Sequence, residues 1–353
     1  MGLIISGTGS YIPEIVVSNQ DFGNHQFINE DGSPFQSSNV EIAQKFEEIT
    51  GIKERRYVSS NLRTSDIAFL AAEKAISNAK IDKEEIDYII FAHNFGDITE
   101  GSVQSEMLPS LASRLKYSLR IKNPKCVAYD LLFGCPGWIE GMIHASAFIK
   151  AGLAKRCLVI GAETLSRTVD TSDRDSMIYS DGAGATIIEY QADAANGFIS
   201  HESATYSYDE AYFLYNGESY DKSRSDHKKY LKMHGRKIYE FALKYVPQAM
   251  LNCIVKANVD VSKIKKILIH QANEKMDEAI INRFYKLCNF PAPKDVMPMS
   301  IHKLGNSSVA TIPTLFDLLI HRKIENHLLG EGDILLFASV GAGMNINAFL
   351  YEF

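Results

Sequence analysis

The chain has little of what marks membrane, secreted or nucleic-acid-binding proteins. No apolar run approaches the roughly 20 residues that a membrane-spanning helix needs. The 5 cysteines are scattered, odd in number and without a CxxC pair, so neither a disulfide framework nor a zinc site is predicted. A net charge of −6 and the lack of a basic block argue against nucleic acid as a partner. Together these absences favour a protein of the reducing cytoplasm.

What is present is an alternation of apolar strand-like runs and segments of helical periodicity. The start, MGLIISGTG, has no basic segment and predicts a strand rather than a signal peptide. Apolar strands that alternate with helices indicate an α/β fold with a largely parallel sheet covered by helices. The runs predict strands near 3–9, 87–94, 126–133, 157–163, 185–190, 266–273 and 334–340, and helices near 67–80, 139–152, 235–258 and 310–323.

Two parts of the chain resemble each other at three places in the same order. Residues 75–94 align with 253–272, Gly134 with Gly305, and 181–190 with 340–349. This pattern is typical of a duplicated α/β unit, although any two βα units share some likeness. We therefore predict an N-terminal half, residues 1–190, and a C-terminal half, residues 191–353. Residues 21–48 and 201–232 are the least repeat-like parts and are predicted to be insertions, either walls of a binding site or plain surface loops.

Cys135 lies at the join of a strand-like run and a predicted helix in LLFGCPGWIEGM. Gly134 and Gly137 permit close backbone approach there, and Pro136 suits a first helical turn. A helix N-terminus favours thiolate and lowers a thiol pKa from about 8.5 toward roughly 3.5–7.5. Cys135 is therefore a candidate nucleophile whose own N–H would help to hold an oxyanion. The alternative is a small buried side chain, which we predict for the other cysteines.

His270 and Asn306 also lie at predicted strand-to-helix junctions. His270 closes the strand in KILIHQAN, and Asn306 follows a glycine before a predicted helix in KLGNSSVATIP. The carboxyl ends of parallel strands are where α/β proteins form their ligand crevices. The alternatives are a core or surface histidine and a plain N-cap asparagine. If the halves are duplicated, Cys135 and Asn306 occupy equivalent turns and face a shared pocket.

Cys135 in FGCPGW, His270 in HQANEK and Asn306 in LGNSSVATIP resemble the Cys-His-Asn triad of the β-ketoacyl-acyl-carrier-protein synthase III family, in the thiolase-like superfamily. The stretches ITGIKERR, SRTVDTSDR, DGAGA and MHGRKIYEFA match as well, so the resemblance covers nearly the whole chain. It implies two halves in a five-layer αβαβα fold, usually in a homodimer. It also implies an acyltransferase that uses thioesters of coenzyme A or acyl carrier protein and needs no metal or redox cofactor.

The implied reaction is a decarboxylating Claisen condensation that gives a β-ketoacyl thioester. Cys135 would take an acyl group from a thioester. His270 and Asn306 would donate hydrogen bonds to a malonyl-type thioester and stabilise its enolate, and the backbone N–H of Ala342 would be a second oxyanion donor. The positions that the resemblance assigns to the substrate arm or to the carrier protein are Arg174, Arg236, Asn273 and Lys275.

Several departures from the family pattern bear on the substrate. Lys45 and Ile49 stand where the family often carries a Trp and an Arg that clamp adenine. Pro136 and Trp138 replace the usual neighbours of the nucleophile, and the C-terminal glycine turn reads SVGAGMN. The reaction could thus initiate fatty acids, or serve specialised lipid or polyketide synthesis with carrier-bound or β-ketoacyl donors, as in resorcinol-type products.

Two further classes are open. A non-catalytic partner of a condensing enzyme would have the same fold, but such partners usually lose triad members and all three are present here. A Cys-His-Asn hydrolase shares the residue types, but papain-like enzymes carry the nucleophile near the mature N-terminus in another local signature.

Overall fold

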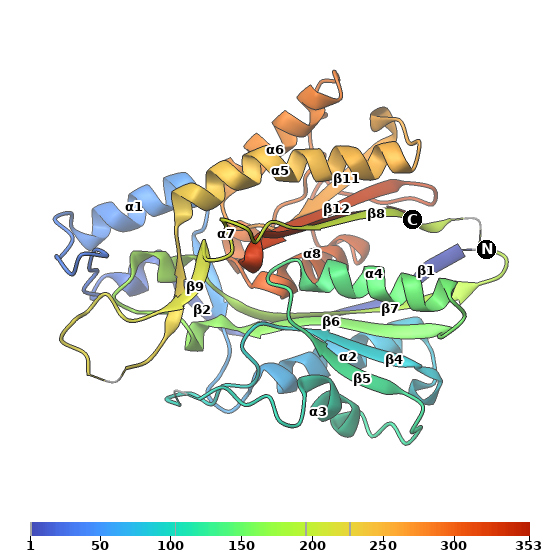
Figure 1. Cartoon of the computed structure of the whole chain (residues 1–353), viewed down its shortest axis with the longest axis horizontal. Coiled ribbons are helices and arrows are strands. Elements are labelled where there is room, and N and C mark those ends of the chain that lie inside the picture. Colours follow the sequence, from blue (N-terminus) through green and yellow to red (C-terminus); the bar gives the residue numbers. More distant parts are fainter. Residues whose placement is uncertain (1, 103, 195, 226) are drawn as a thin grey trace.

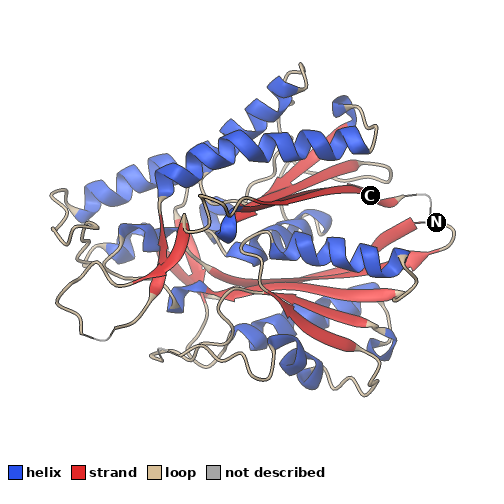
Figure 2. Ribbon diagram, in the orientation of Figure 1, coloured by secondary structure: helices blue, strands red, loops and turns tan. Residues whose placement is uncertain are grey.

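Two β-sheets alternate with three layers of helices in the computed structural model (Figures 1 and 2). The structure describes residues 2–102, 104–194, 196–225 and 227–353. The first sheet has the strand order β1-β7-β6-β4-β5 and the second has the order β11-β12-β13-β8. The strands of the first sheet are β1 (Gly2–Tyr11), β4 (Tyr88–Ala92), β5 (Val127–Leu131), β6 (Arg156–Thr164) and β7 (Asp181–Gln191). Those of the second are β8 (Gly197–Thr205), β11 (Ile264–Ile269), β12 (Ile334–Gly341) and β13 (Asn345–Glu352).

The helices cover both outer faces and fill the space between the sheets (Figure 1). The outer layers are α2 (Thr64–Ala79) with α3 (Leu111–Ser118), and α5 (Gly235–Lys256) with α6 (Glu274–Leu287). The middle layer consists of α4 (Gly137–Lys150) and α8 (Thr311–Ile320). One apolar cluster runs from the first sheet through this middle layer to the second sheet, and in it the Phe337 and Phe349 rings stack at 4.3 Å between centroids. The predicted five-layer αβαβα architecture is therefore confirmed.

The two sheets repeat one strand pattern. In the first, β1 pairs antiparallel with β7, β7 antiparallel with β6, and β6 parallel with β4. In the second, β8, β13, β12 and β11 pair in the same order and with the same orientations. The fifth strand, β5, has an irregular counterpart, because the Ile267 N–H donates to the Val296 carbonyl at 2.8 Å beside β11. This shared topology agrees with a duplicated unit, while the half boundary at residues 190 and 191 stays a prediction.

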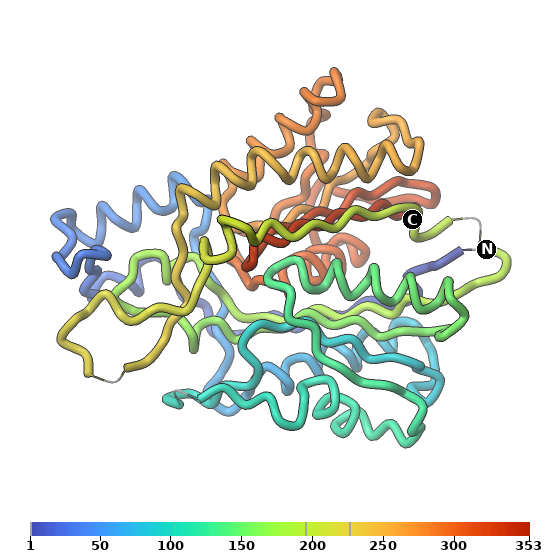
Figure 3. The backbone as a smooth tube through the Cα atoms, viewed as in Figure 1, coloured from blue at the N-terminus to red at the C-terminus, as the bar shows by residue number. Residues whose placement is uncertain are grey.

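The predicted insertions lie toward the same end of the molecule, opposite the two chain ends (Figure 3). They contact each other, since a Cβ added at Gly32 would lie 3.5 Å from the Lys222 side chain. Both predicted ranges extend into regular secondary structure. Residues 39–48 belong to helix α1 (Asn39–Thr50), and residues 201–205 belong to strand β8, whose alternating polar face resembles a loop. The elements at this end also include β2 (Ile15–Ser18), β3 (Glu54–Tyr57) and the hairpin of β9 (Leu214–Gly217) and β10 (Tyr230–Met233), whose residue 226 lies outside the described part.

A buried ion cluster fixes the β9–β10 hairpin to the body of the protein. The Lys232 ammonium lies 2.6 Å from an Asp170 carboxylate oxygen and 2.9 Å from one of Asp173. It also lies 3.4 Å from the centroid of the Tyr220 ring, and the backbone N–H of Tyr220 donates to Asp170. Lys232 is only 1% exposed, so loss of its charge would leave two poorly solvated carboxylates without this buried partner.

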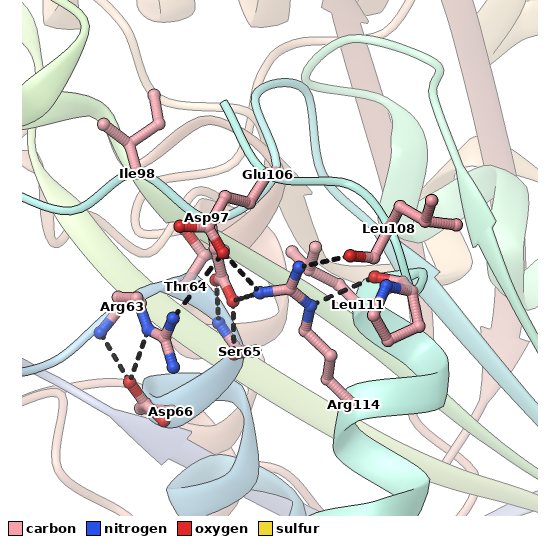
Figure 4. A network of polar contacts seen from close by, with 12 residues as sticks. Arg63, Thr64, Ser65, Asp66, Asp97, Ile98, Glu106, Leu108, Leu111 and Arg114 are labelled. Atoms are coloured by element: carbon pink, nitrogen blue, oxygen red, sulfur yellow. Dashed lines mark hydrogen bonds and ion pairs between the residues drawn. The ribbon is translucent and has the colours of Figure 1, made fainter. Parts of the chain in front are cut away.

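A second polar network holds the segment that follows β4 (Figure 4). The buried Asp97 carboxylate accepts from the Ser65 N–H at 2.7 Å and from the Ser65 hydroxyl at 2.6 Å, at the start of α2. Its other neighbour is Arg114 of α3, which donates to Asp97 at 2.9 Å and to the Leu108 carbonyl at 3.1 Å. The exit of β4 is therefore tied to both helices that cover the first sheet. No helix among the described residues is both long and apolar enough to cross a membrane.

Candidate active site

Cys135 lies in the turn between β5 and α4, against a second glycine turn. A Cβ added at Gly341 would lie 2.4 Å from the Cys135 backbone nitrogen, and one added at Gly134 would lie 2.6 Å from the Ala342 nitrogen. Gly134 also has a φ of 67°, in the left-handed region that favours glycine. The backbones of Cys135 and Ala342 are thus brought together by two glycines that allow no side chain.

The expectation of an acidic thiol at Cys135 is wrong. Helix α4 begins at Gly137, two residues after the cysteine, and Pro136 is its N-cap. Burial raises the pKa of the Cys135 thiol to about 11, and the nearby Glu163 carboxylate adds to this, while a hydrogen bond from Ser308 lowers it. The thiol is half-buried at the wall of a cavity, and the apolar surroundings disfavour the thiolate.

His270 follows β11 and is a neutral imidazole. The backbone N–H of His270 donates to the Ala338 carbonyl at 2.9 Å, which continues the parallel pairing with β12. Burial without a nearby opposite charge lowers the pKa of His270 to about 4. Its Nδ1 atom is buried and has no hydrogen-bond partner among the described residues. At pH 7 the ring therefore offers one N–H to a ligand and carries no charge.

The next residue, Gln271, joins the His270 strand end to the Asn306 loop. Its side-chain nitrogen donates to the Pro298 carbonyl at 2.8 Å, and its oxygen accepts from the Ser300 N–H at 2.9 Å and the Ile301 N–H at 3.1 Å. These bonds support the short helix α7 (Ile301–Leu304), which leads into the turn that carries Asn306. The sequence analysis gave Gln271 no role, because its partners lie about thirty residues away.

Asn306 is held at both its backbone and its side chain. Its N–H donates to the Ile178 carbonyl at 3.0 Å, and its carbonyl accepts from the Ser180 N–H at 2.8 Å. The side-chain oxygen accepts from the Ser308 N–H at 2.8 Å, a local turn close to the N-cap alternative. Because the oxygen is used in this bond, the amide nitrogen is the end that remains to donate to a ligand.

One cavity of about 780 Å³ joins these residues. Cys135, His270, Asn306 and Ala342 all line it, although they come from four separate turns. Among the described residues, no group of three or more His, Cys, Asp or Glu side chains is placed to hold a metal ion. The cavity therefore brings together a thiol, a neutral imidazole, a carboxamide and a glycine turn.

Of the four predicted binding residues, three line the cavity and one does not. Arg174 lies 5.6 Å from the centroid of the Phe35 ring and pairs with Asp175. Arg236 is highly exposed and pairs with Glu240, and Asn273 caps α6 by accepting from the Met276 N–H at 3.1 Å. Lys275 is exposed on the first turn of α6 and is not among the residues that line the cavity.

The substituted positions also separate into cavity and core. Lys45 and Ile49 line the cavity, so the change from the family's aromatic and cationic pair lies on its wall. Trp138 is 1% exposed and packs against Phe337 and Phe349 in the core between the two sheets. It is a core residue, and substrate specificity is not to be sought in its side chain.

Three polar side chains that the sequence analysis did not select extend from Cys135 into the first sheet. The Ser308 hydroxyl donates to the Cys135 sulfur at 3.2 Å. The Asn94 amide donates to the Ser308 oxygen at 3.1 Å and to Glu163 at 2.7 Å. In the alignment of residues 75–94 with 253–272, His93 lies one residue beyond the position of His270. The place of Asn94 directly after it, at the end of a predicted strand, is the one feature of the sequence that could have indicated a site residue.

Comparison with known proteins identifies the family of the chain. Two family models match, 3-oxoacyl-[acyl-carrier-protein (ACP)] synthase III over residues 129–207 and its C-terminal part over residues 254–353. The β-ketoacyl-[acyl-carrier-protein] synthase III of Staphylococcus saprophyticus is 32% identical over 349 residues, which cover 99% of this chain and 98% of the relative. The crystal structure of the Aquifex aeolicus synthase III has a TM-score of 0.80 at 28% identity over 100% of both chains. That of Thermus thermophilus has 0.81 at 29%, over 99% of both.

The fold and the cavity define a condensing enzyme of the thiolase-like class. The chain belongs to the β-ketoacyl-acyl-carrier-protein synthase III family. It is an acyltransferase that forms a carbon–carbon bond between acyl groups carried as thioesters.

Proposed function

We propose that Cys135, His270 and Asn306 carry out a decarboxylating Claisen condensation that converts an acyl thioester and a malonyl-type thioester into a β-ketoacyl thioester. The observation that carries this proposal is the convergence of the three side chains on one cavity from β5, β11 and the turn before α8. The chemistry of each group fits one of the two half-reactions.

In the first half-reaction, the Cys135 sulfur attacks the carbonyl carbon of the acyl thioester. The carbonyl oxygen becomes an oxyanion, for which the neighbouring backbone N–H groups of Cys135 and Ala342 are the proposed donors. Collapse of this intermediate breaks the carbon–sulfur bond of the donor. The acyl group stays on Cys135, and the proton that the Cys135 thiol gives up goes to the leaving sulfur, so the donor departs as a free thiol.

In the second half-reaction, His270 and Asn306 donate hydrogen bonds to the thioester carbonyl of the malonyl group. Carbon dioxide leaves, and the electron pair of the broken bond forms an enolate whose oxygen these donors stabilise. The enolate carbon attacks the acyl-Cys135 carbonyl, and the sulfur of Cys135 leaves. The low pKa of His270, about 4, keeps it neutral, so it acts as a donor and not as a fixed positive charge.

The wall of the cavity supports a carrier-bound or β-ketoacyl donor as a second candidate substrate. Ile49 is 51% exposed at a position where the family often has a group that clamps adenine. Arg174 is engaged with Phe35 and Asp175, so it is not free to replace that clamp without changing partners. Comparing cysteine acylation by an acyl-CoA and by the same acyl group on carrier protein separates the two: faster loading from the carrier favours the second candidate.

We further propose that acyl carrier protein is the partner, that Lys275 and Arg236 take part in docking it, and that the enzyme is a cytoplasmic homodimer. Both cations are exposed, and the names of the relatives include the carrier. All 5 cysteines are free thiols in the structure, as a reducing compartment would keep them. Light scattering on the purified chain tests the dimer, and a monomer at micromolar concentration contradicts it.

The proposed condensation is tested by incubating the protein with an acyl thioester and malonyl-carrier protein and following the β-ketoacyl product by mass spectrometry. Wild-type protein should form product, and Cys135→Ala should form none. His270→Ala should still accept the acyl group at Cys135 but should lose decarboxylation. Free fatty acid as the only product would show a hydrolase, and absence of both products would show a non-catalytic partner.

A further inference from the structure

A chain of polar groups, of which Ser308 and Asn94 line the cavity, runs from Cys135 into the core of the first sheet. It consists of Ser308 before α8, Asn94 after β4, and Glu163 near the end of β6. These three residues come from different elements. Among the described residues, their side chains form no hydrogen bond with His270 or Asn306. The condensation mechanism above gives them no step.

The direction of the hydrogen bonds follows from the donor capacity of each group. The Glu163 Oε1 atom accepts from the Asn94 backbone N–H at 2.6 Å and from the side chain at 2.7 Å. It is an acceptor in both protonation states, because Oε2 has no partner among the described residues and is the oxygen that holds the proton when the carboxyl is neutral. The Asn94 side chain must therefore present its nitrogen. The same nitrogen donates to the Ser308 oxygen at 3.1 Å. The single proton of the Ser308 hydroxyl is then left for the Cys135 sulfur at 3.2 Å.

The backbone at Ser308 is held in a conformation that aims this hydroxyl. Ser308 has a φ of 54°, which is uncommon for a residue other than glycine. Its N–H is taken by the Asn306 side-chain oxygen. The serine is 5% exposed, so water has little access to replace the Asn94 contact.

We propose that Asn94 and Glu163 are positioning residues for the nucleophile, acting through Ser308 to commit a hydroxyl proton to the Cys135 sulfur. This rests on the proposed function of Cys135 as the acyl carrier. The proton bond favours the thiolate, and the charge of Glu163 opposes it, so the two ends of the chain act on the thiol with opposite signs. Replacing each member therefore gives a distinguishable result.

The other titratable groups near this chain lie on several elements. His93 and Asp181 act on Glu163, while Tyr179 interacts electrostatically with Cys135. His270 shares the cavity and is neutral at neutral pH. None of these is changed in the variants below, so a shift between variants reports the chain itself.

The test measures the rate of iodoacetamide alkylation of Cys135 against pH, in the full-length protein without substrate and with peptide mass spectrometry to identify the modified cysteine. Ser308→Ala and Asn94→Ala should each raise the apparent pKa of Cys135 by about one unit, a roughly tenfold lower rate at a pH below it. The double variant should be no slower than either single one, because both changes act through the same Ser308–Cys135 hydrogen bond. Glu163→Gln should shift the pKa downward and speed alkylation several-fold.

A matched control exists in the same chain. The Ser200 hydroxyl lies 3.3 Å from the Cys253 sulfur, outside the cavity, so Ser200→Ala removes a serine–cysteine contact and should leave the Cys135 profile unchanged. Asn94→Leu keeps the volume and serves if Asn94→Ala lowers the thermal midpoint.

The proposal is overturned if Cys135 in both Asn94 variants alkylates as in wild type, or if the Ser308 and Asn94 effects multiply. It is also overturned if Glu163→Gln slows alkylation as Asn94→Ala does, which would show a purely structural support. Because alkylation needs no thioester, an altered profile without acyl transfer would keep the chain and reject the proposed function of Cys135.

Discussion

Replacing Asn306 separates its two roles, because its oxygen and its nitrogen have different partners. The side-chain oxygen accepts from the Ser308 N–H at 2.8 Å, which holds the turn. The nitrogen is the proposed donor to the enolate. Asn306→Ala removes both atoms, whereas Asn306→Asp keeps an acceptor for Ser308 and, when ionised, has no donor.

The expected magnitudes follow from these two bonds. Loss of one donor to a developing oxyanion costs about a hundredfold to a thousandfold in rate, so both variants should decarboxylate malonyl thioester at least about a hundredfold more slowly. Loss of the acceptor leaves a buried N–H unpaired and costs about 1–3 kcal/mol, which applies to the alanine variant alone. Stability is measured by urea unfolding, and decarboxylation by mass spectrometry of the thioester at pH 8.

Acylation of Cys135 is the internal control for Asn306→Asp. It should stay within a few-fold of wild type, since the turn beside the cysteine is kept. The division of roles would be refuted if Asn306→Ala decarboxylated within a factor of ten of wild type. Equal loss of acylation and decarboxylation in Asn306→Asp would refute it as well.

Three other perturbations test the fold around the cavity. Lys232→Met should destabilise the protein by about 3–5 kcal/mol in urea, because it removes the buried cation that pairs with both Asp170 and Asp173. Lys229→Met, which breaks the exposed pair with Glu218, should leave the midpoint nearly unchanged, and equal effects would contradict the role of burial. Burial raises the pKa of Glu163 from 4.5 to about 7, so its contribution to stability is present below pH 4.5 and is lost as pH rises through 7, a change of about 3 kcal/mol. Glu163→Gln should remove this loss of stability between pH 5 and 8. If the thermal midpoints of the wild type and the variant fell in parallel over this range, the carboxyl would not be buried as described. Gly341→Ala should abolish acylation because its Cβ would lie 2.4 Å from the Cys135 nitrogen, whereas Gly235→Ala has open space and should acylate as wild type does; a fully active Gly341→Ala would contradict the close packing of the two turns.

Much of the fold was predictable because strands and helices of this chain differ in their periodicity. Apolar runs such as 157–163 and 334–340 became the central strands β6 and β12 of the two sheets. Cys135 and His270 follow the parallel strands β5 and β11, and both line the cavity, as expected of residues at the carboxyl ends of strands. Asn306 also lines it, but it follows helix α7 and not the predicted strand. Strand β8 was not predicted, because its residues 201–205 (HESAT) alternate between exposed and half-buried at a sheet edge.

The electrostatics of the site depended on contacts that local sequence does not encode. A helix N-terminus predicts a lowered pKa for the Cys135 thiol. Burial, together with Glu163, which lies 28 residues further along the chain, raises this pKa instead. Asn94 and Ser308, which complete the surroundings of Cys135, are 214 residues apart.

The central claim is that Cys135 carries the acyl group, and intact-protein mass spectrometry measures this acylation directly. Protein mixed with a panel of acyl thioesters in the absence of malonyl thioester should gain the mass of one acyl group. Peptide mapping should place this mass on Cys135, and it should vanish in Cys135→Ala while Cys253→Ala, at a buried cysteine outside the cavity, retains it. Acylation that persists in Cys135→Ala, or no acylation of wild type by any thioester of the panel, would contradict the account.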